Sequence, residues 1–217
     1  MRNRELQLLL VGIIFILSCG NSESSGFTEG RVLTQSGVPV SNAELHIGFP
    51  QFSKKSKYNT SITINFPLQS STNLSFEVKR YGSDEFILGF EDRPFRAGSH
   101  SLVIPDSLLT TGVYTYKIES EVFSTERNIL KLKSDNDLIN NSTPFTMTDN
   151  SGRFQLDTNT FGIGVKFAET IDIDETVSFS IDNEIEFITI KNSEIIARKT
   201  VMISENSENY VELIVQD

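Results

Sequence analysis

The chain has 217 residues, 38% of them hydrophobic, and 29 acidic residues against 19 basic ones give it a net charge of −10. With this acidic balance, and with Lys54–Lys57 as its densest basic cluster, the sequence argues against a surface that follows nucleic-acid phosphates. Cys19 is the single cysteine, so no internal disulfide can form and stability must come from packing. A chain of this length has room for two folding units.

Residues 1–19 have the features of a secretory signal peptide. Arg2 and Arg4 precede an apolar run over residues 8–17, which is roughly half as long as a transmembrane helix needs to be. The run leads into Ile16-Leu17-Ser18-Cys19-Gly20, which resembles a bacterial lipobox.

In a lipobox the cysteine is lipidated and becomes the first residue of the mature protein, so the resemblance implies a lipid anchor on Cys19. The alternative is an ordinary signal peptide in which this cysteine is incidental. Residues 20–26, GNSESSG, are small, polar and without periodicity, and they predict a tether between the anchor and the folded part.

The stretch from Gly30 to Gly48 predicts two strands joined by a turn. Ser36-Gly37-Val38-Pro39 marks the turn, because glycine allows positive φ and proline fixes its own φ. The second strand alternates apolar with polar side chains: Ala43, Leu45 and Ile47 with Glu44 and His46. About a hundred residues later, the turn-forming cluster Asp149–Gly152 precedes another alternating strand with Phe154 and Leu156 on one face.

These two stretches resemble the carboxypeptidase regulatory-like domain, a transthyretin-like β-sandwich. The matching patterns are Gly-x-Val, then Gly-x-Pro-Val-x-Asn-Ala, within residues 30–43, and Thr-Asp-x-x-Gly-x-Phe at residues 148–154. The resemblance covers residues 27–48 and 143–217, and it implies a fold and an accessory setting rather than a reaction. Residues 159–167, NTFGIGVKF, replace the family's Pro-Gly-x-Tyr segment, so the strand order after them stays open.

After a linker at residues 50–57, residues 57–134 predict a second, self-contained β unit. Short alternating segments with turn signals every 8 to 12 residues are typical of a β-sandwich. Pro67 indicates that the first of these strands ends there or lies at a sheet edge. Further along, Tyr114 and Tyr116 are expected on one face of a strand.

Within this unit, residues 59–133 resemble the Ig-like domain of the flagellar hook-capping protein and the C-terminal sorting domain of type IX secretion. The matching segments are NTSITINF at 59–66, AGSH at 97–100, SLLTTGVYTY at 107–116 and ERNILKLK at 126–133. The Trp-Asp expected in the middle is Pro105-Asp106 here, and the tail motif ends 84 residues before Asp217. The resemblance therefore implies an Ig-like module that does not act as a sorting signal.

The sequence thus predicts an all-β chain of two nested β-sandwiches, a transthyretin-like host and an Ig-like or FN3-like insert. Two strands at Gly30–Gly48 are too few to bury a core alone. Residues 43–47 should therefore share one core with Phe154, Leu156 and the C-terminal strand. The polar segment 134–142 is expected to return the chain to the host.

No arrangement of residues indicates catalysis or a metal site. His46 and His100 are the only histidines, and neither is followed by the x-x-Glu spacing of a zinc carboxypeptidase. We expect His46 at the surface beside Glu44, and His100 in the turn at residues 97–100. No Gly-x-Ser-x-Gly motif supplies a nucleophile. The chain is predicted not to be an enzyme and to have no cofactor.

Two acidic segments and the tyrosines raise binding alternatives. Asp135–Asp137 and Asp172–Glu175 offer oxygen ligands for calcium, but they lack the spacing of a calcium loop and favour solvated turns. A stacking platform would need tyrosines that gather on one surface, whereas scattered strand positions favour packing. The tyrosines are Tyr58, Tyr81, Tyr114, Tyr116 and Tyr210.

These features together predict a non-catalytic lipoprotein of a Gram-negative cell envelope, anchored in the outer membrane, that acts as a structural or adhesive binding module. The alternative is an accessory component of an outer-membrane uptake or secretion machine that binds carbohydrate or protein. In both cases the membrane is contacted through the lipid on Cys19, and nucleic acid is not a partner.

Overall fold

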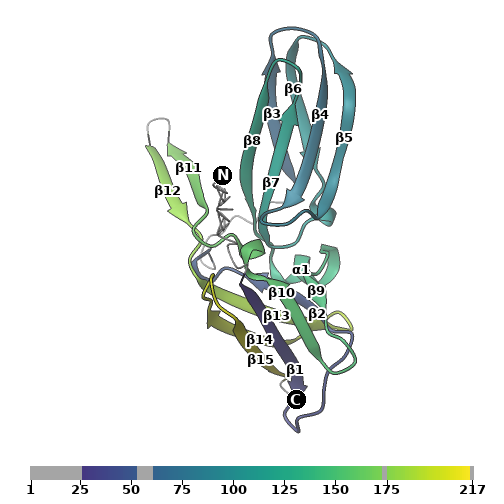
Figure 1. Cartoon of the computed structure of the whole chain (residues 1–217), viewed down its shortest axis with the longest axis vertical. Helices are drawn as coiled ribbons and strands as arrows, with labels where there is room; N and C mark the ends of the chain where they lie inside the picture. The colour runs from purple at the N-terminus through teal and green to yellow at the C-terminus, as the bar shows by residue number, and fades with distance from the viewer. Residues whose placement is uncertain (1–25, 53–60, 173–174, 216–217) are drawn as a thin grey trace, which may run out of the picture.

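The computed structural model describes residues 26–52, 61–172 and 175–215, and in these ranges the regular structure is strands, one short α-helix and three short 3-10 segments. The strands form two lobes, one above the other in Figure 1, which confirms the all-β sandwich fold expected from the sequence. We call the lobe built from residues 26–52 and 143–215 the first lobe. The lobe built from residues 61–133 is the second lobe.

One sheet of the first lobe has the strand order β10-β1-β15. Its central strand β1 (Phe27–Thr34) is antiparallel to β10 (Arg153–Asp157) and parallel to β15 (Asn209–Val215). The N-terminal strand is thus held between two strands that follow the second lobe in sequence. We call this sheet the three-stranded sheet.

The other sheet of the first lobe has the order β14-β13-β2-β9. It consists of β2 (Glu44–Gly48), β9 (Thr146–Met147), β13 (Glu184–Lys191) and β14 (Glu194–Met202). All its strand pairs are antiparallel. Here too β2, which precedes the second lobe, lies between strands that follow it.

The core of the first lobe lies between these two sheets. Alternate residues of β1 point inward, and Val32 among them is fully buried. The same cluster takes side chains from both sheets: Leu45, Ile47, Phe154, Leu156, Phe187, Val211 and Leu213. The expectation that residues 43–47 share a core with Phe154, Leu156 and the C-terminal strand is confirmed.

Hydrogen bonds and a glycine fix the turn before β10. Asp149 Oδ1 accepts hydrogen bonds from the backbone N–H groups of Ser151 and Arg153, each 2.8 Å long. Gly152 has a φ of 70°, and a Cβ there would lie 2.6 Å from the carbonyl oxygen of Val32. Glycine is required at this position for both reasons. The turn predicted at Asp149–Gly152 is confirmed.

The second lobe is a smaller sandwich with a two-stranded and a four-stranded sheet. The two-stranded sheet pairs β3 (Ile62–Leu68) with β6 (Gly98–Ile104), and the other has the order β5-β4-β7-β8. The bounds of its strands are Thr72–Arg80 for β4, Phe86–Phe95 for β5, Gly112–Glu119 for β7 and Ser124–Lys131 for β8. Among the described residues β3 pairs with β6 alone, so Pro67 lies on an edge strand, as predicted.

The second lobe has a hydrophobic core of its own. Phe66, Phe76 and Ile118 are buried in it, together with Tyr114 and Tyr116. The common face predicted for the two tyrosines is therefore confirmed. This core is a separate cluster from that of the first lobe, although Val113 and Leu132 of the second lobe pack into the first cluster.

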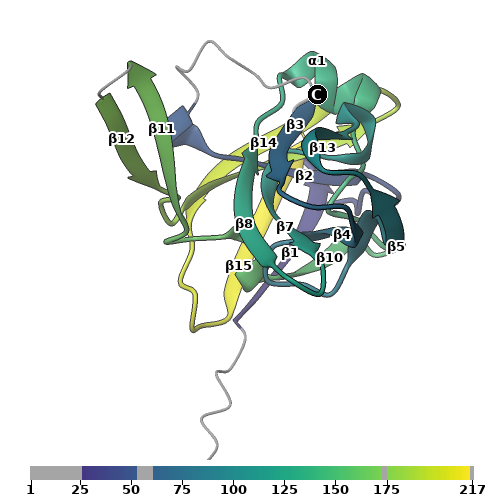
Figure 2. The ribbon, with the colours of Figure 1, turned by 90° about the horizontal axis from the view of Figure 1, so that it is seen from above.

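A hairpin projects from the first lobe beside the second lobe. It consists of β11 (Lys166–Asp172) and β12 (Glu175–Ser180), and Figures 1 and 2 show it as a separate arm. At its base the rings of Phe167 and Phe179 stack with their centroids 5.6 Å apart. The chain then continues through β13, β14 and β15, which gives the strand order that the sequence left open.

Helix α1 (Asp135–Asn141) occupies the segment for which the sequence predicted a polar linker and a solvated acidic turn. Ser134 caps it, because its Oγ accepts a hydrogen bond of 3.2 Å from the N–H of Asp137. Leu138 is buried against the outer side of β13. The solvent exposure predicted for this acidic segment is confirmed at Asp135, whose side chain is 64% exposed, but the segment is a helix rather than a turn, since Leu138 docks it. No helix among the described residues is long and apolar enough to cross a membrane.

Deletion of residues 61–133, closed with a short Gly/Ser linker, should leave a folded first lobe, because Phe52 and Leu138 keep their buried places. Deletion of residues 52–140 removes both side chains and should leave the rest unfolded. Losing a buried Phe or Leu costs about 2 to 5 kcal/mol each, comparable with the stability of a domain. Circular dichroism and thermal melting of both deletions, with the full chain as control, test this. Equal melting of the two would contradict it.

Candidate functional site

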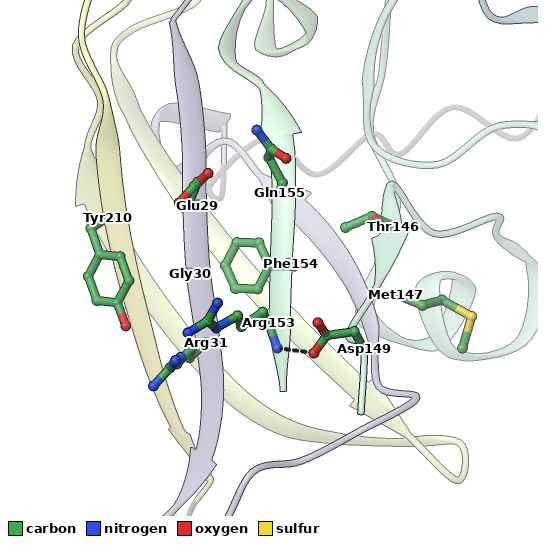
Figure 3. Close-up of a pocket in the computed structure, with 10 residues that line it drawn as sticks. All are labelled: Glu29, Gly30, Arg31, Thr146, Met147, Asp149, Arg153, Phe154, Gln155 and Tyr210. Atoms are coloured by element: carbon green, nitrogen blue, oxygen red, sulfur yellow. Dashed lines mark hydrogen bonds between the residues drawn. The ribbon is translucent and has the colours of Figure 1, made fainter. Parts of the chain in front are cut away.

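The outward face of the three-stranded sheet is the candidate site. Outward side chains of its strands line an open hollow of about 620 Å³, shown in Figure 3, together with residues beside β10: Glu29, Arg31, Arg153, Gln155, Tyr210, Thr146, Met147 and Asp149. The outer face of the other sheet is covered. Ile188 and Ile190 of β13 are buried there beneath α1. Of the two outer faces, the three-stranded sheet therefore presents the open one.

Two arginines lie directly opposite each other on this open face. Arg31 of β1 is the register partner of Arg153 of β10. The neighbouring pair is joined by a 2.8 Å hydrogen bond from Val32 N–H to Gly152 O, which puts the arginines at a non-hydrogen-bonded position of the ladder. Cβ atoms at such positions lie about 4.5 to 5.5 Å apart, and like charges there repel. Within the described ranges neither guanidinium has an ion pair or hydrogen bond.

A row of polar and aromatic groups runs beside the arginines. Glu29 is the register partner of Gln155 on one side and of Tyr210 on the other. Tyr210 is 62% exposed, and Met147, which is 50% exposed, borders the hollow beyond β10. The face thus combines two cations, a carboxylate, an amide and a free aromatic ring. Such groups form hydrogen bonds to a ligand and stack on it.

The turn before β10 holds Arg153 in place. Hydrogen bonds, first from the backbone N–H of Arg153 and then from the Ser151 hydroxyl, lower the pKa of Asp149. Figure 3 shows the bond to the Arg153 backbone as a dashed line. Because the Asp149 carboxylate is engaged by the turn, its main effect is to fix the backbone from which the Arg153 side chain extends.

His46 is buried, contrary to the surface position predicted for it. Its side chain has no exposed area, and its Nδ1 lies 3.1 Å from the Thr110 hydroxyl of the second lobe. The alternation of β2 was read correctly, but the second lobe covers the face on which His46 lies. Burial lowers the pKa of His46; Glu44, 3.5 Å away, opposes this effect, whereas Lys133 and Arg80 add to it.

An ion cluster of the second lobe lies next to His46 and contacts α1. Asp106, in the 3-10 segment Asp106–Leu108, pairs with Lys131 and, at 3.2 Å, with Lys133. Burial alone would raise the pKa of Asp106, but the hydrogen bonds from the two lysines outweigh it and hold the pKa below its usual value. Lys133 also donates to the carbonyl of Asn141 in the last turn of α1. One carboxylate thus organises β8, the 3-10 segment and the helix.

Aromatic contacts complete this junction. The guanidinium carbon of Arg80 lies 3.9 Å from the centroid of the Phe145 ring, which packs against the core of the first lobe. Arg80 Nε donates a 2.7 Å hydrogen bond to Glu85. The Tyr114 hydroxyl accepts from the N–H of Thr110, and burial raises the pKa of this tyrosine. No sequence pattern pointed to the junction, because its members are far apart along the chain.

Several residues singled out from the sequence lie outside the described part of the chain. These are Cys19, the Lys54–Lys57 cluster, Tyr58 and the middle of the acidic segment Asp172–Glu175. Among the residues that the structure does describe, no group of three or more His, Cys, Asp or Glu side chains is placed to hold a metal ion.

The other predicted positions are divided between the core and the surface. His100 lies within β6 rather than in a turn; its ring centroid is 5.2 Å from that of Phe95, and its Nε2–H donates to the carbonyl of Arg96. Tyr114 and Tyr116 are core residues, and Tyr81 is partly buried. Of the tyrosines that the structure describes, Tyr210 is the one on the candidate face, and only its strand alternation pointed outward in the sequence.

Replacing Asp106 with Asn should destabilise the protein by about 3 kcal/mol, because two buried lysines would lose their carboxylate. Asp84→Asn, an exposed change of the same kind, should alter stability by less than about 0.5 kcal/mol. Urea unfolding of both variants measures the difference. An unchanged midpoint for Asp106→Asn would show that the cluster does not hold the junction.

Acidification should destabilise the folded chain through His46. Below its ordinary pKa of 6.5 the unfolded state takes up a proton that the folded state, with its lowered pKa, does not. Stability should therefore fall as the pH drops from about 7 to 5, by at most about 1.4 kcal/mol per pH unit. Unfolding curves of His46→Gln should lose this slope, and those of the control His100→Gln should keep it. A slope that persists in His46→Gln would assign it to another group.

The geometry of the open face supports binding: its charged, amide and aromatic groups point into one hollow on a rigid sheet. In the ion cluster, in contrast, the two lysines are buried, and Asp106, which is 28% exposed, is engaged with them. No protein-family model matches this chain, and no curated protein sequence matches it either.

Proposed function

We propose that this chain is a non-catalytic binding module of the bacterial cell envelope, held at the outer membrane by a lipid on Cys19. The observation that carries the binding role is the open face of the three-stranded sheet, where Arg31, Arg153 and Tyr210 extend from a packed sandwich. Exposed groups of this kind on a rigid scaffold are typical of recognition rather than of fold stability.

The N-terminal sequence and the start of β1 support the anchor. Residues 20–26 separate Cys19 from Phe27, where β1 begins. A fully extended segment of this length spans at most about 25 Å, so a lipid on Cys19 would keep the first lobe near the bilayer. The net charge of −10 disfavours direct contact with anionic headgroups, which leaves the lipid as the membrane contact.

We also propose the family relationships suggested by the sequence. Residues 27–48 and 143–217 would form a carboxypeptidase regulatory-like unit, into which residues 57–134 are inserted as an Ig-like unit. In support, the two stretches that carry the first resemblance contribute to one core, with Val32 and Ala43 beside Phe154. The inserted stretch, residues 57–134, contributes most of its buried side chains to the other core. The exact boundaries of the units stay predictions.

Replacing Cys19 with Ser should release the protein from the membrane fraction and abolish labelling by a palmitate analogue, because the acceptor thiol is lost. Ser24→Ala, a change in the tether that keeps the cysteine, should leave both properties unaltered. Cell fractionation with metabolic labelling measures them. A Cys19→Ser variant that stays in the membrane fraction would contradict the lipoprotein proposal.

Crosslinking in intact cells should separate the two binding roles. A component of an uptake or secretion machine should give one dominant protein adduct, whereas a structural or adhesive module should give none that dominates. Mass spectrometry of the adducts measures this, and Cys19→Ser, released from the membrane, is the control for encounters that are not specific.

A further inference from the structure

We infer that the open face of the three-stranded sheet binds an acidic glycan. Arg31 and Arg153 would hold a sugar carboxylate, and Tyr210 would stack on the sugar ring. This inference rests on the proposed binding function, and it names the ligand class of that site.

The arginine pair supplies the reason for an anion. The two residues face each other at a non-hydrogen-bonded position, where their side chains are close and repel. Glu212, the register partner of Arg31 on β15, makes no ion pair with it among the described residues. A carboxylate between the guanidinium groups would relieve the repulsion and accept paired hydrogen bonds from these planar donors.

The next row supplies the reason for a sugar. Tyr210 lies across the sheet from Glu29, which is two residues before Arg31 on β1. From strand spacing and rise, the Cα atoms of Tyr210 and Arg31 are about 8 Å apart. A pyranose ring stacked on the tyrosine would thus place its carboxylate within reach of the arginines. Glu29 and Gln155 would then accept from and donate to the ring hydroxyls.

The surrounding charge favours a single carboxylate over a phosphate polymer. Glu29 lies two residues before Arg31 on β1 and Glu212 lies opposite Arg31 on β15, both on the same face, so the local charge is mixed. The whole chain has a net charge of −10, which repels ligands with dense negative charge. A neutral sugar ring with one acidic group fits two guanidinium groups that have the carboxylates of Glu29 and Glu212 nearby.

The edge of the sheet argues against a peptide added as a further strand. Arg153 on β10 has its outward backbone groups occupied, since its N–H bonds to Asp149 Oδ1 and its carbonyl accepts from the N–H of Asp149. The carbonyl of Asp157 accepts from the Thr160 hydroxyl. Too little of this edge is left for the backbone ladder that strand addition requires. On the β10 side, recognition therefore falls to the face, where the side chains are.

Titration calorimetry of the full chain carrying Cys19→Ser tests the inference, with methyl galacturonoside, a single pyranose ring that carries one carboxylate, as the probe. Its methyl ester, which lacks the charge, should bind at least tenfold more weakly. Arg31→Gln with Arg153→Gln should lose tenfold or more in affinity for the acid, and Tyr210→Ala threefold or more. The matched control is Arg96→Gln with Arg127→Gln, which removes two exposed charges from the second lobe and should bind normally.

Thermal melting shows whether the arginine variant is folded. Because it removes repulsion, its melting temperature should equal or exceed that of the parent chain, whereas a purely structural role of the pair would lower it. Equal binding of acid and ester, or an equal loss in the control, overturns the inference. Tighter, arginine-dependent binding of a polyglutamate peptide would assign the face to an acidic protein segment. No binding of either probe also overturns the glycan, and the anchor is then judged separately by membrane release in Cys19→Ser.

Discussion

The placement of the second lobe depends on charge balance at a buried junction. Asp106 is the carboxylate that faces both Lys131 and Lys133, and Lys133 in turn reaches the end of α1. His46 is buried in the same region, and this burial lowers its pKa. Buried ion pairs add little net stability compared with apolar packing, but they tolerate few alternative arrangements. The junction therefore specifies how the lobes meet more than it holds them together.

This junction also decides which face of the first lobe is open. The second lobe and α1 cover the outer side of the β14-β13-β2-β9 sheet. There β13 is buried on both sides from Phe187 to Ile190. β1, β10 and β15 instead alternate buried and outward residues along their length. A sheet covered on both faces tends towards continuous apolar runs, and one covered on a single face alternates. The open face is thus recorded in the strand patterns themselves.

These patterns explain what could be predicted from the sequence. Leu45 and Ile47 were placed in the core by alternation, and the turn at Asp149–Gly152 by its chemistry, since both signals are local. His46 and α1 were misplaced for a common reason: their burial comes from parts of the chain distant in sequence. The pairing of Arg31 with Arg153 could not be foreseen either, because it depends on strand register.

That pairing is where the chain departs from the rules that the rest of it follows. A pair of opposite charges, or an apolar pair, would stabilise this position. Glu212, opposite Arg31 on β15, is near enough to form such an ion pair with it. The surrounding core does not require arginine, since the side chains on this face point away from it. Where a sequence is locally consistent elsewhere, a position that keeps an unfavourable pair is best explained by function. The stability of the sandwich comes from its interior, which leaves this face free to carry a repulsion that a ligand would relieve.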